Sequence, residues 1–127
     1  MRALAALVAV LLSISHALAG PSPGKEGATT ILCTKASIDR VVAGALVSMD
    51  AANKAYAVAT RERTCIYYAG GIPVTAVRPV LSYTDFAGHY YDVWELSITN
   101  DTREKLLAMT LVDVTWTPYV WVRKEGI

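Results

Sequence analysis

The stretch CIYYAGGIPVTAV, residues 65–77, places two short apolar segments on either side of a turn rich in glycine and proline. Its β-branched and aromatic residues favour strands, and Gly70-Gly71 followed by Pro73 favours a turn between them. We therefore predict one strand over Thr64 to Tyr68 and a second over Val74 to Leu81. Because the same composition continues downstream, the second half of the chain is expected to be β-rich.

Three more strands are predicted further along the chain, each bounded by turn-forming residues. They span His89 to Ile98, Leu107 to Trp116 and Tyr119 to Arg123. In the second of them, apolar and polar residues alternate from Val112 to Thr117, which indicates a strand with one buried face. A single helical turn starting at Asp101 remains an alternative just before it, because a glutamate three residues later suits a capping box.

Upstream of the β-rich half, apolar residues recur at alternating spacings of four and three, which is the period of one helix face. This pattern predicts helical structure over residues 35–62, with Ser37 as a plausible N-cap. Asp50 could start a second helix, so one bent helix and two short helices both stay open. Two strands in this region are disfavoured by its alanine content. The periodic residues are Ile38, Val42, Ala45, Met49, Ala52, Tyr56 and Ala59.

The N-terminus has the three regions of a secretory signal peptide. Residues 1–19 begin with the basic Arg2, continue with an apolar run from Ala3 to Leu12, and end with small residues. Cleavage is expected near Ala19-Gly20, which makes the protein secreted or periplasmic. The apolar run is shorter than the roughly 20 residues that a membrane-spanning helix needs, and no membrane insertion of the mature chain is expected.

Residues 20–34 follow the predicted cleavage site and begin with GPSPGKEGATT, in which glycine and proline are frequent and no hydrophobic period is visible. This composition predicts a flexible mature N-terminus. Residues 35–127 are then expected to form a single domain, helical over 35–62 and β-rich over 63–127.

Cys33 and Cys65 are the two cysteines of the chain, and both lie after the predicted signal peptide. Because exported proteins meet oxidising conditions, we predict a structural disulfide between them. It would join the start of the helical segment to the first strand. A redox-active pair is disfavoured, since such pairs usually have close Cys-x-x-Cys spacing.

The charge of the chain excludes some classes of partner. The full sequence has 12 basic and 11 acidic residues, and Arg2 is the only charged residue before position 20. The mature chain is therefore neutral and has no net attraction for nucleic acid or acidic lipid. We predict no nucleic-acid partner and no cofactor.

Together these elements predict an α+β fold in which the N-terminal helical segment packs on a small five-stranded antiparallel sheet or barrel. The segment CIYYAGGIPVTAV and the closing Tyr119-Val-Trp-Val resemble the entry and last strand of the SH3-like barrels of small exported bacterial proteins. The resemblance covers the second half of the chain. It implies a binding or structural module without inherited catalytic residues.

His89 is the only histidine after the predicted signal peptide, which limits catalytic and metal chemistry. Asp85, His89 and Asp92 could offer metal ligands, but His89 and Asp92 would face opposite sides of one strand, so no metal site is predicted. A small hydrolase using His89 with Asp85 or Asp92 is an alternative hypothesis. A Ser-His-Asp arrangement of Ser82 or Ser97 with His89 and Asp92 is disfavoured, because neither serine has the sequence context of a nucleophile.

The aromatic residues give the main functional hypothesis. Strand alternation predicts that some rings between Tyr83 and Trp94 point outward, and exposed aromatic rings are enriched at interfaces. In the last strand, Val120 and Val122 are expected to face inward, with Trp121 outward or at a rim. We predict an exported, non-catalytic protein that binds a protein, peptide or cell-envelope ligand; the alternative is an inhibitor or immunity-type protein against a secreted enzyme. The predicted binding residues are Tyr83, Phe86, Tyr90 and Trp94.

Overall fold

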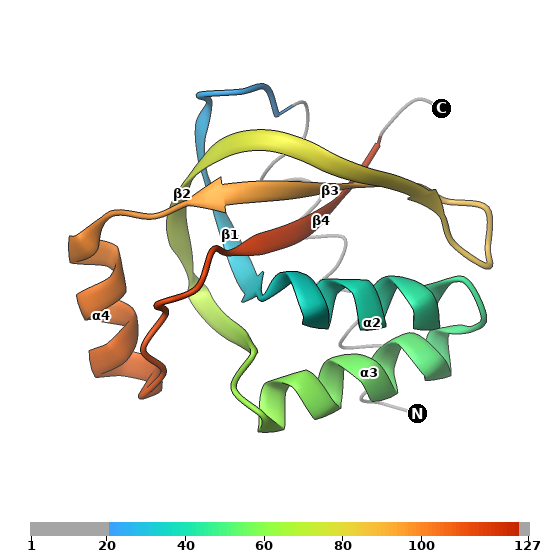
Figure 1. Cartoon of the computed structure of the whole chain (residues 1–127), viewed down its shortest axis with the longest axis horizontal. Coiled ribbons are helices and arrows are strands. Elements are labelled where there is room, and N and C mark those ends of the chain that lie inside the picture. Colours follow the sequence, from blue (N-terminus) through green and yellow to red (C-terminus); the bar gives the residue numbers. More distant parts are fainter. Residues whose placement is uncertain (1–20, 125–127) are drawn as a thin grey trace.

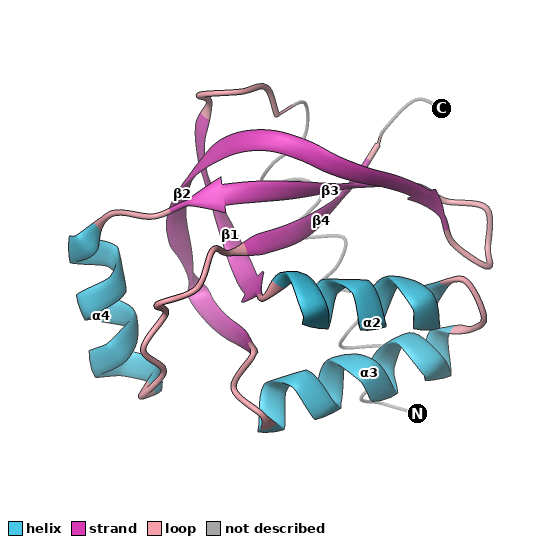
Figure 2. Ribbon diagram, in the orientation of Figure 1, coloured by secondary structure: helices cyan, strands magenta, loops and turns pink. Residues whose placement is uncertain are grey.

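The computed structural model describes residues 21–124, so the predicted signal peptide at residues 1–19 lies outside the described residues. The described elements are β1 (Glu26–Cys33), α2 (Lys35–Ala45), α3 (Met49–Arg61), β2 (Cys65–Thr84), β3 (Tyr90–Ser97), α4 (Asn100–Thr110) and β4 (Tyr119–Arg123). The strands close into an antiparallel barrel in the order β1-β2-β3-β4. Helices α2 and α3 lie side by side along one side of this barrel, and α4 lies at one end (Figures 1 and 2). The α+β class is confirmed, with four strands among these residues in place of the predicted five.

Strand β1 corrects the prediction that residues 20–34 are flexible. Its residues pair with β2 from Glu26 opposite Thr75 to Cys33 opposite Cys65. The side chains of Ile31 and Leu32 are 0% exposed and belong to the core. The local glycine and proline content suggested disorder, but pairing with a long partner strand supplies the backbone hydrogen bonds that the segment cannot supply itself.

Strand β2 is a single strand of 20 residues where two strands and a turn were predicted. Its first half pairs with β1 and its second half with β3, and the register shifts at one point along the first ladder and at two points along the second. Gly71 has a φ of 87°, a conformation that glycine adopts at no steric cost, and it lets the strand bend instead of ending. The strong curvature of β2 is visible in Figure 1.

The predicted disulfide between Cys33 and Cys65 is confirmed. The two cysteines are register partners at one end of the β1–β2 ladder. The bond therefore joins two strands, because residues 26–33, just before the first helix, form a strand themselves. Both cysteines are buried in the core.

The helical region consists of two helices, which settles the alternative that the sequence left open. Helix α2 is capped by Thr34, whose hydroxyl accepts a hydrogen bond from the Ser37 backbone N–H at 3.2 Å. Ser37 is therefore not the N-cap, and its buried hydroxyl donates to Thr64 Oγ1 at 2.7 Å. Ser48 is the N-cap of helix α3, and its hydroxyl accepts a hydrogen bond from the Ala51 N–H at 3.0 Å; Asp50 lies in the first turn of the helix.

The two helices pack closely at Gly44, where a Cβ atom would lie 2.7 Å from the Ala51 carbonyl oxygen. Helix propensity favours alanine over glycine by up to about 1 kcal/mol. We expect the steric overlap to outweigh this gain, so that Gly44→Ala lowers the free energy of unfolding by about 1 to 3 kcal/mol. Urea denaturation would measure the change. Ala43→Gly, at an exposed position of the same helix, is the control, because it measures the effect of helix propensity without a contact to α3. An increase in stability for Gly44→Ala would contradict the close contact between the helices.

The predicted strand from Leu107 to Trp116 is wrong. Residues 100–110 form helix α4, whose N-cap Thr99 accepts a hydrogen bond from the Thr102 N–H at 3.2 Å. After the helix, Val112 and Val114 are buried as the alternation indicated, but their backbone belongs to no strand. Arg103 donates to the Val114 carbonyl oxygen and ties this segment to α4. The alternation of apolar and polar residues in this segment therefore predicted correctly that Val112 and Val114 are buried, but it did not indicate that the segment pairs with a sheet.

Strand β4 occupies its predicted range, and Val120 and Val122 are buried as expected. Trp121 was expected outward or at a rim, but it is 1% exposed. Its ring contacts Tyr56 of α3 edge to face, with the ring centroids 6.1 Å apart. The helices cover the face of β4 that a bare sheet would leave open, so the alternation rule does not separate buried from exposed residues here.

None of the helices within residues 21–124 is long and apolar enough to cross a bilayer.

Candidate functional site

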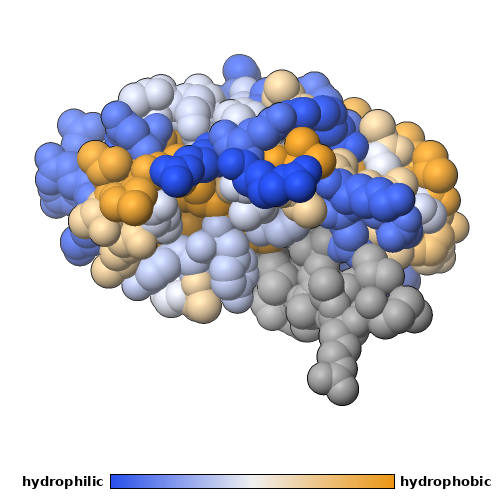
Figure 3. All heavy atoms as spheres, turned by 90° about the horizontal axis from the view of Figure 1, so that it is seen from below, coloured by the Kyte–Doolittle hydropathy of each residue, from blue (hydrophilic) through white to orange (hydrophobic). Residues whose placement is uncertain are grey.

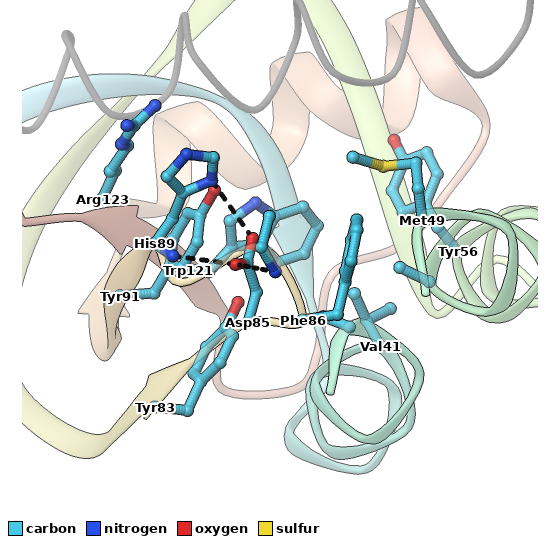
Figure 4. Close-up of a pocket in the computed structure, with 13 residues that line it drawn as sticks. Val41, Met49, Tyr56, Tyr83, Asp85, Phe86, His89, Tyr91, Trp121 and Arg123 are labelled. Atoms are coloured by element: carbon cyan, nitrogen blue, oxygen red, sulfur yellow. Dashed lines mark hydrogen bonds and ion pairs between the residues drawn. The ribbon is translucent and has the colours of Figure 1, made fainter. Parts of the chain in front are cut away.

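A pocket of about 180 Å³ lies between the α2–α3 pair, the connection from β2 to β3, and strand β4 (Figure 4). Three groups of residues line it, and each comes from a different part of the chain. The helices contribute Val41, Ala45, Met49, Ala52 and Tyr56; the β2–β3 hairpin contributes Tyr83, Asp85, Phe86, Ala87, His89 and Tyr91; and β4 contributes Trp121 and Arg123.

The hairpin tip, residues 85–89, is held in one shape by Asp85. One oxygen of its carboxylate accepts hydrogen bonds from the backbone N–H groups of Ala87 and His89, each at 2.9 Å. The Asp85 N–H also donates to the His89 carbonyl at 2.9 Å, and Gly88 takes a φ of 86° that closes the turn. These bonds fix the position of the side chains that the tip presents to the pocket.

The tip is also attached to the helices. The backbone N–H of Phe86 donates to the carbonyl oxygen of Ala45 at the end of α2, at 2.9 Å. This bond satisfies one of the helix carbonyl groups that lack a partner within the helix. It brings the Phe86 ring to the pocket beside the α2 residues, so the hairpin and the helices form one continuous wall.

The pocket has an apolar side and a polar side. In Figure 4, the side chains of Val41 and Met49 lie on one side, and those of His89 and Tyr91 lie on the other. His89 Nδ1 is 3.4 Å from Asp85 Oδ2, and the Asp85 side chain is 8% exposed. A buried carboxylate with an imidazole and two backbone donors is a satisfied structural group.

The predicted binding residues fall into three environments. Tyr83 is half-buried in the pocket wall and stacks on Tyr91, with ring centroids 5.2 Å apart and an angle of 13° between the planes. Phe86 lines the pocket and is 47% exposed. Tyr90 is 43% exposed but is outside the pocket lining. The structure therefore brings Tyr83 and Phe86 together at one site.

Trp94 corrects the prediction of an outward ring, because it is 5% exposed and belongs to the core. Its neighbour Val93 is buried as well, so both faces of β3 are covered at this point. Alternation separates buried from exposed side chains only where one face of a strand meets solvent, and at Val93 and Trp94 both faces are covered.

Exposed apolar side chains border the pocket. Leu46 and Val47 are exposed in the turn between α2 and α3, directly after Ala45, whose carbonyl oxygen accepts the Phe86 N–H; Phe86 itself is also exposed. In Figure 3, hydrophobic surface appears at this end of the molecule and also at the opposite end, where α4 lies. At the α4 end the exposed apolar side chains are Leu107, Met109 and Leu111.

Burial of the tyrosines around the pocket opposes their ionisation. Desolvation raises the pKa of Tyr56 to about 12 and raises the pKa of Tyr83 strongly above its ordinary value of 10. The pKa of Tyr91 is also raised, first by burial and then by the negative charge of Asp85. The phenol groups are therefore neutral at physiological pH.

We expect these tyrosines to make the protein sensitive to alkali. Because the folded state holds the phenols neutral while the unfolded chain ionises them near pH 10, their contribution to stability is complete below pH 10 and is lost as the pH rises towards 12. Denaturation midpoints measured across this interval should fall, and Tyr83→Phe should make the fall less steep. Ionisation of every tyrosine of the folded protein in one step near pH 10, followed by phenolate absorbance, would contradict this expectation.

Among the residues considered for hydrolase and metal chemistry, the structure brings Asp85 and His89 together. Ser82 donates to Asp92 Oδ1 at 2.5 Å, so this serine pairs with a carboxylate and not with an imidazole. His89 contacts Asp85 instead. Within residues 21–124, no group of three or more His, Cys, Asp and Glu side chains is placed to hold a metal ion.

Several pocket residues were not predicted as functional. Ala45, Met49, Ala52 and Tyr56 belong to the helix face that the sequence period identified, but the sequence did not show that this stretch of the face meets a hairpin. Trp121 was expected at a rim and instead lines the pocket from β4.

No protein-family model, curated protein or solved structure matches this chain.

Proposed function

We propose that this protein is an exported, non-catalytic binding module that holds one apolar group of a protein, peptide or cell-envelope ligand in the pocket between α2, α3 and the β2–β3 hairpin. The observation that carries this proposal is the pocket of about 180 Å³ with exposed apolar residues at its border. Export is part of the proposal, because the disulfide suits an oxidising compartment and residues 1–19 have the pattern of a signal peptide.

The size of the pocket suits a group of about one aromatic ring. An apolar cavity of roughly 150 Å³ stays dry and binds benzene. The pocket here is about 180 Å³, which leaves room for a ring with one small substituent or for a branched aliphatic side chain. Val41, Met49 and Phe86 would contact such a group.

The exposed apolar residues beside the pocket favour a macromolecular partner that brings this group. Phe86 of the pocket lining is exposed, and Leu46 and Val47 are exposed directly after the lining residue Ala45. Clustered exposed apolar side chains mark interaction sites in soluble proteins. An anchoring side chain in a pocket surrounded by less deeply buried contacts is the usual anatomy of a binding hot spot.

The pocket is also formed before a ligand arrives. The hydrogen bond from Phe86 to Ala45 and the two bonds to the Asp85 carboxylate hold its mouth in place. A pre-formed site loses less conformational entropy on binding, which favours affinity.

A toluene titration followed by NMR would test the proposed site. In the wild-type protein we expect saturable shifts of the methyl resonances of Val41 and Met49, which line the pocket. Ala45→Leu adds three carbon atoms to a pocket-lining position on α2 and should abolish these shifts. Ala43→Leu makes the same change at an exposed position of the same helix and should leave them unchanged.

Two results would contradict the proposal. One is the absence of saturable shifts in the wild-type protein, which would mean that the pocket does not accept an apolar group. The other is equal binding to the Ala45→Leu and Ala43→Leu proteins, which would place the toluene elsewhere. Amide spectra of both variants establish that each has kept the wild-type fold.

A further inference from the structure

Aromatic side chains from five separate segments line the pocket. A pocket built from rings differs from one built from aliphatic side chains, because the face of an aromatic ring carries partial negative charge. Such a face attracts cations as well as apolar groups. The aromatic lining residues are Tyr56 of α3, Tyr83 of β2, Phe86 of the hairpin tip, Tyr91 of β3 and Trp121 of β4.

Three of these rings offer surface to a ligand. Phe86 is 47% exposed, and Tyr56 and Tyr83 are half-buried. The other two rings are almost completely covered and support the first three: Tyr91 stacks on Tyr83, and Trp121 contacts Tyr56 with an angle of 90° between the ring planes. These pairs hold the rings of Tyr83 and Tyr56 in place, so the aromatic surface is formed before a ligand binds.

Asp85 adds a negative charge to this aromatic surface. Its side chain is 8% exposed, so water screens the charge only weakly. Burial is the main cause of the raised pKa of Tyr83 and Tyr91, and the charge of Asp85 raises both further; at Tyr91 it outweighs the opposing effect of Arg123. In Figure 4, Arg123 lies across the pocket from Tyr56. A positive charge is therefore favoured beside the rings, on the side of the pocket away from Arg123.

The kind of cation follows from hydrogen bonding. A primary ammonium group has three N–H donors and a guanidinium has five, and each donor that enters an apolar pocket without an acceptor is unfavourable. The Asp85 carboxylate already accepts the backbone N–H groups of Ala87 and His89. A quaternary ammonium group has no N–H donors and an outer surface of methyl groups. It therefore combines the positive charge with the apolar surface that the pocket accommodates.

We infer that the pocket recognises a quaternary ammonium group, carried by a small solute or by a lipid headgroup, and that the rings of Tyr56, Tyr83 and Phe86 contact its methyl groups. This inference rests on the proposed function and specifies the ligand of the same pocket. A trimethylammonium group has the shape of a tert-butyl group, and a branched group of this size fits a pocket of about 180 Å³. Asp85 supplies the negative charge that favours the cation over its neutral counterpart.

Choline and 3,3-dimethyl-1-butanol provide a matched test, because they share shape and size and differ by a charged nitrogen in place of a carbon. We expect choline to bind the wild-type protein roughly five- to thirtyfold more tightly, the range for one or two cation–π contacts. Titrations followed by NMR would measure both affinities. Nuclear Overhauser effects from the choline methyl protons to the ring protons of Phe86 and Tyr56 should locate the bound group.

Equal affinities of the two compounds, or tighter binding of the alcohol, would overturn the inference and leave the pocket as an apolar site that binds toluene. Failure of choline to bind a protein that binds toluene would overturn it as well. Failure of choline, the alcohol and toluene together would instead overturn the proposed function.

Two variants test the groups that would recognise the cation. Phe86→Leu keeps an apolar side chain but removes the ring, and it should lower the preference for choline over the alcohol at least about threefold. Tyr90→Leu removes an equally exposed ring outside the pocket lining and should leave the preference unchanged. Asp85→Asn keeps a side-chain oxygen for the hairpin tip and removes the charge, so it should weaken the binding of choline and not of the alcohol.

A full preference for choline in both Phe86→Leu and Asp85→Asn would place the cation outside this pocket and overturn the inference. Amide spectra establish that each variant has kept the wild-type fold. Co-sedimentation with phosphatidylcholine vesicles, and not with phosphatidylglycerol vesicles, would assign the group to a lipid headgroup. Binding of choline without binding of either vesicle would assign it to a small solute, and equal binding of both vesicles would contradict recognition of the headgroup.

Discussion

Replacing both cysteines in Cys33→Ala/Cys65→Ala is expected to lower the free energy of unfolding by about 3 to 4 kcal/mol. The disulfide closes a loop with a sequence separation of 32, and the loss of chain entropy in the unfolded state gives this magnitude. A change of this size is a large share of the stability of a small domain and should lower the melting temperature by roughly 15 °C or more. Guanidinium denaturation of both proteins at neutral pH would measure it.

The reduced wild-type protein is the control for the cysteine variant. Its stability under a thiol reductant should lie close to that of the double variant, because both lack the cross-link. The β1–β2 ladder continues for several residue pairs beyond the cysteines, so we expect both proteins to remain folded with a lower midpoint. If the free energy of unfolding falls by less than about 1 kcal/mol, removal of the disulfide adds little conformational freedom to the unfolded chain, and the entropic explanation is wrong.

Leu32→Ala is expected to lower the free energy of unfolding by about 2 to 5 kcal/mol. Leu32 is 0% exposed in β1, so truncation removes buried apolar surface and leaves a cavity in the core. The control is Leu107→Ala, the same chemical change at an exposed position of α4, which should cost less than about 1 kcal/mol. Thermal denaturation of the two variants beside the wild type would measure the difference.

This comparison tests the largest correction to the sequence-based expectation. If residues 26–33 were a flexible N-terminus, Leu32→Ala would be as mild as Leu107→Ala. A strand inside the core predicts a large difference between them. Equal stabilities would contradict the placement of β1.

Much of the fold was predictable from local patterns. The periodic apolar residues located the helical region, and capping side chains at Thr34 and Ser48 divide it into α2 and α3. Strands β3 and β4 lie where β-branched and aromatic residues indicated. The disulfide followed from the number of cysteines and the predicted export. Each of these features depends on residues that are close in sequence or on chemistry that is independent of the fold.

Other features depended on distant partners. β1 and the uninterrupted β2 exist because each supplies the other with hydrogen bonds along a curved ladder, which overrides the turn preference at Gly70-Gly71. Helix α4 replaced a predicted strand because Thr99 caps it and Arg103 anchors the chain after it. The resemblance to SH3-like barrels stays a prediction.

The candidate site was only partly predictable for the same reason. The sequence predicted Tyr83 and Phe86 as binding residues, because strand alternation sends some rings of this segment outward and Phe86 lies at a loop tip. It could not indicate that the Phe86 N–H donates to the Ala45 carbonyl oxygen at the end of α2. This contact between distant segments holds one side of the pocket in place. It also placed Trp94 and Trp121 at the surface, since alternation assumes a sheet with one open face, and here both rings are covered.

By itself, the sequence determined the α+β class, the helical region that contains α2 and α3, and the pairing of Cys33 with Cys65. Periodicity and cysteine chemistry require no knowledge of distant contacts. The tertiary structure alone decided that residues 26–33 enter the barrel, that both faces of β4 are covered, and that α2, α3, the hairpin and Trp121 enclose one pocket. These features arise where segments far apart in the chain meet, and their free energy comes from burial and hydrogen bonds that neither segment forms alone.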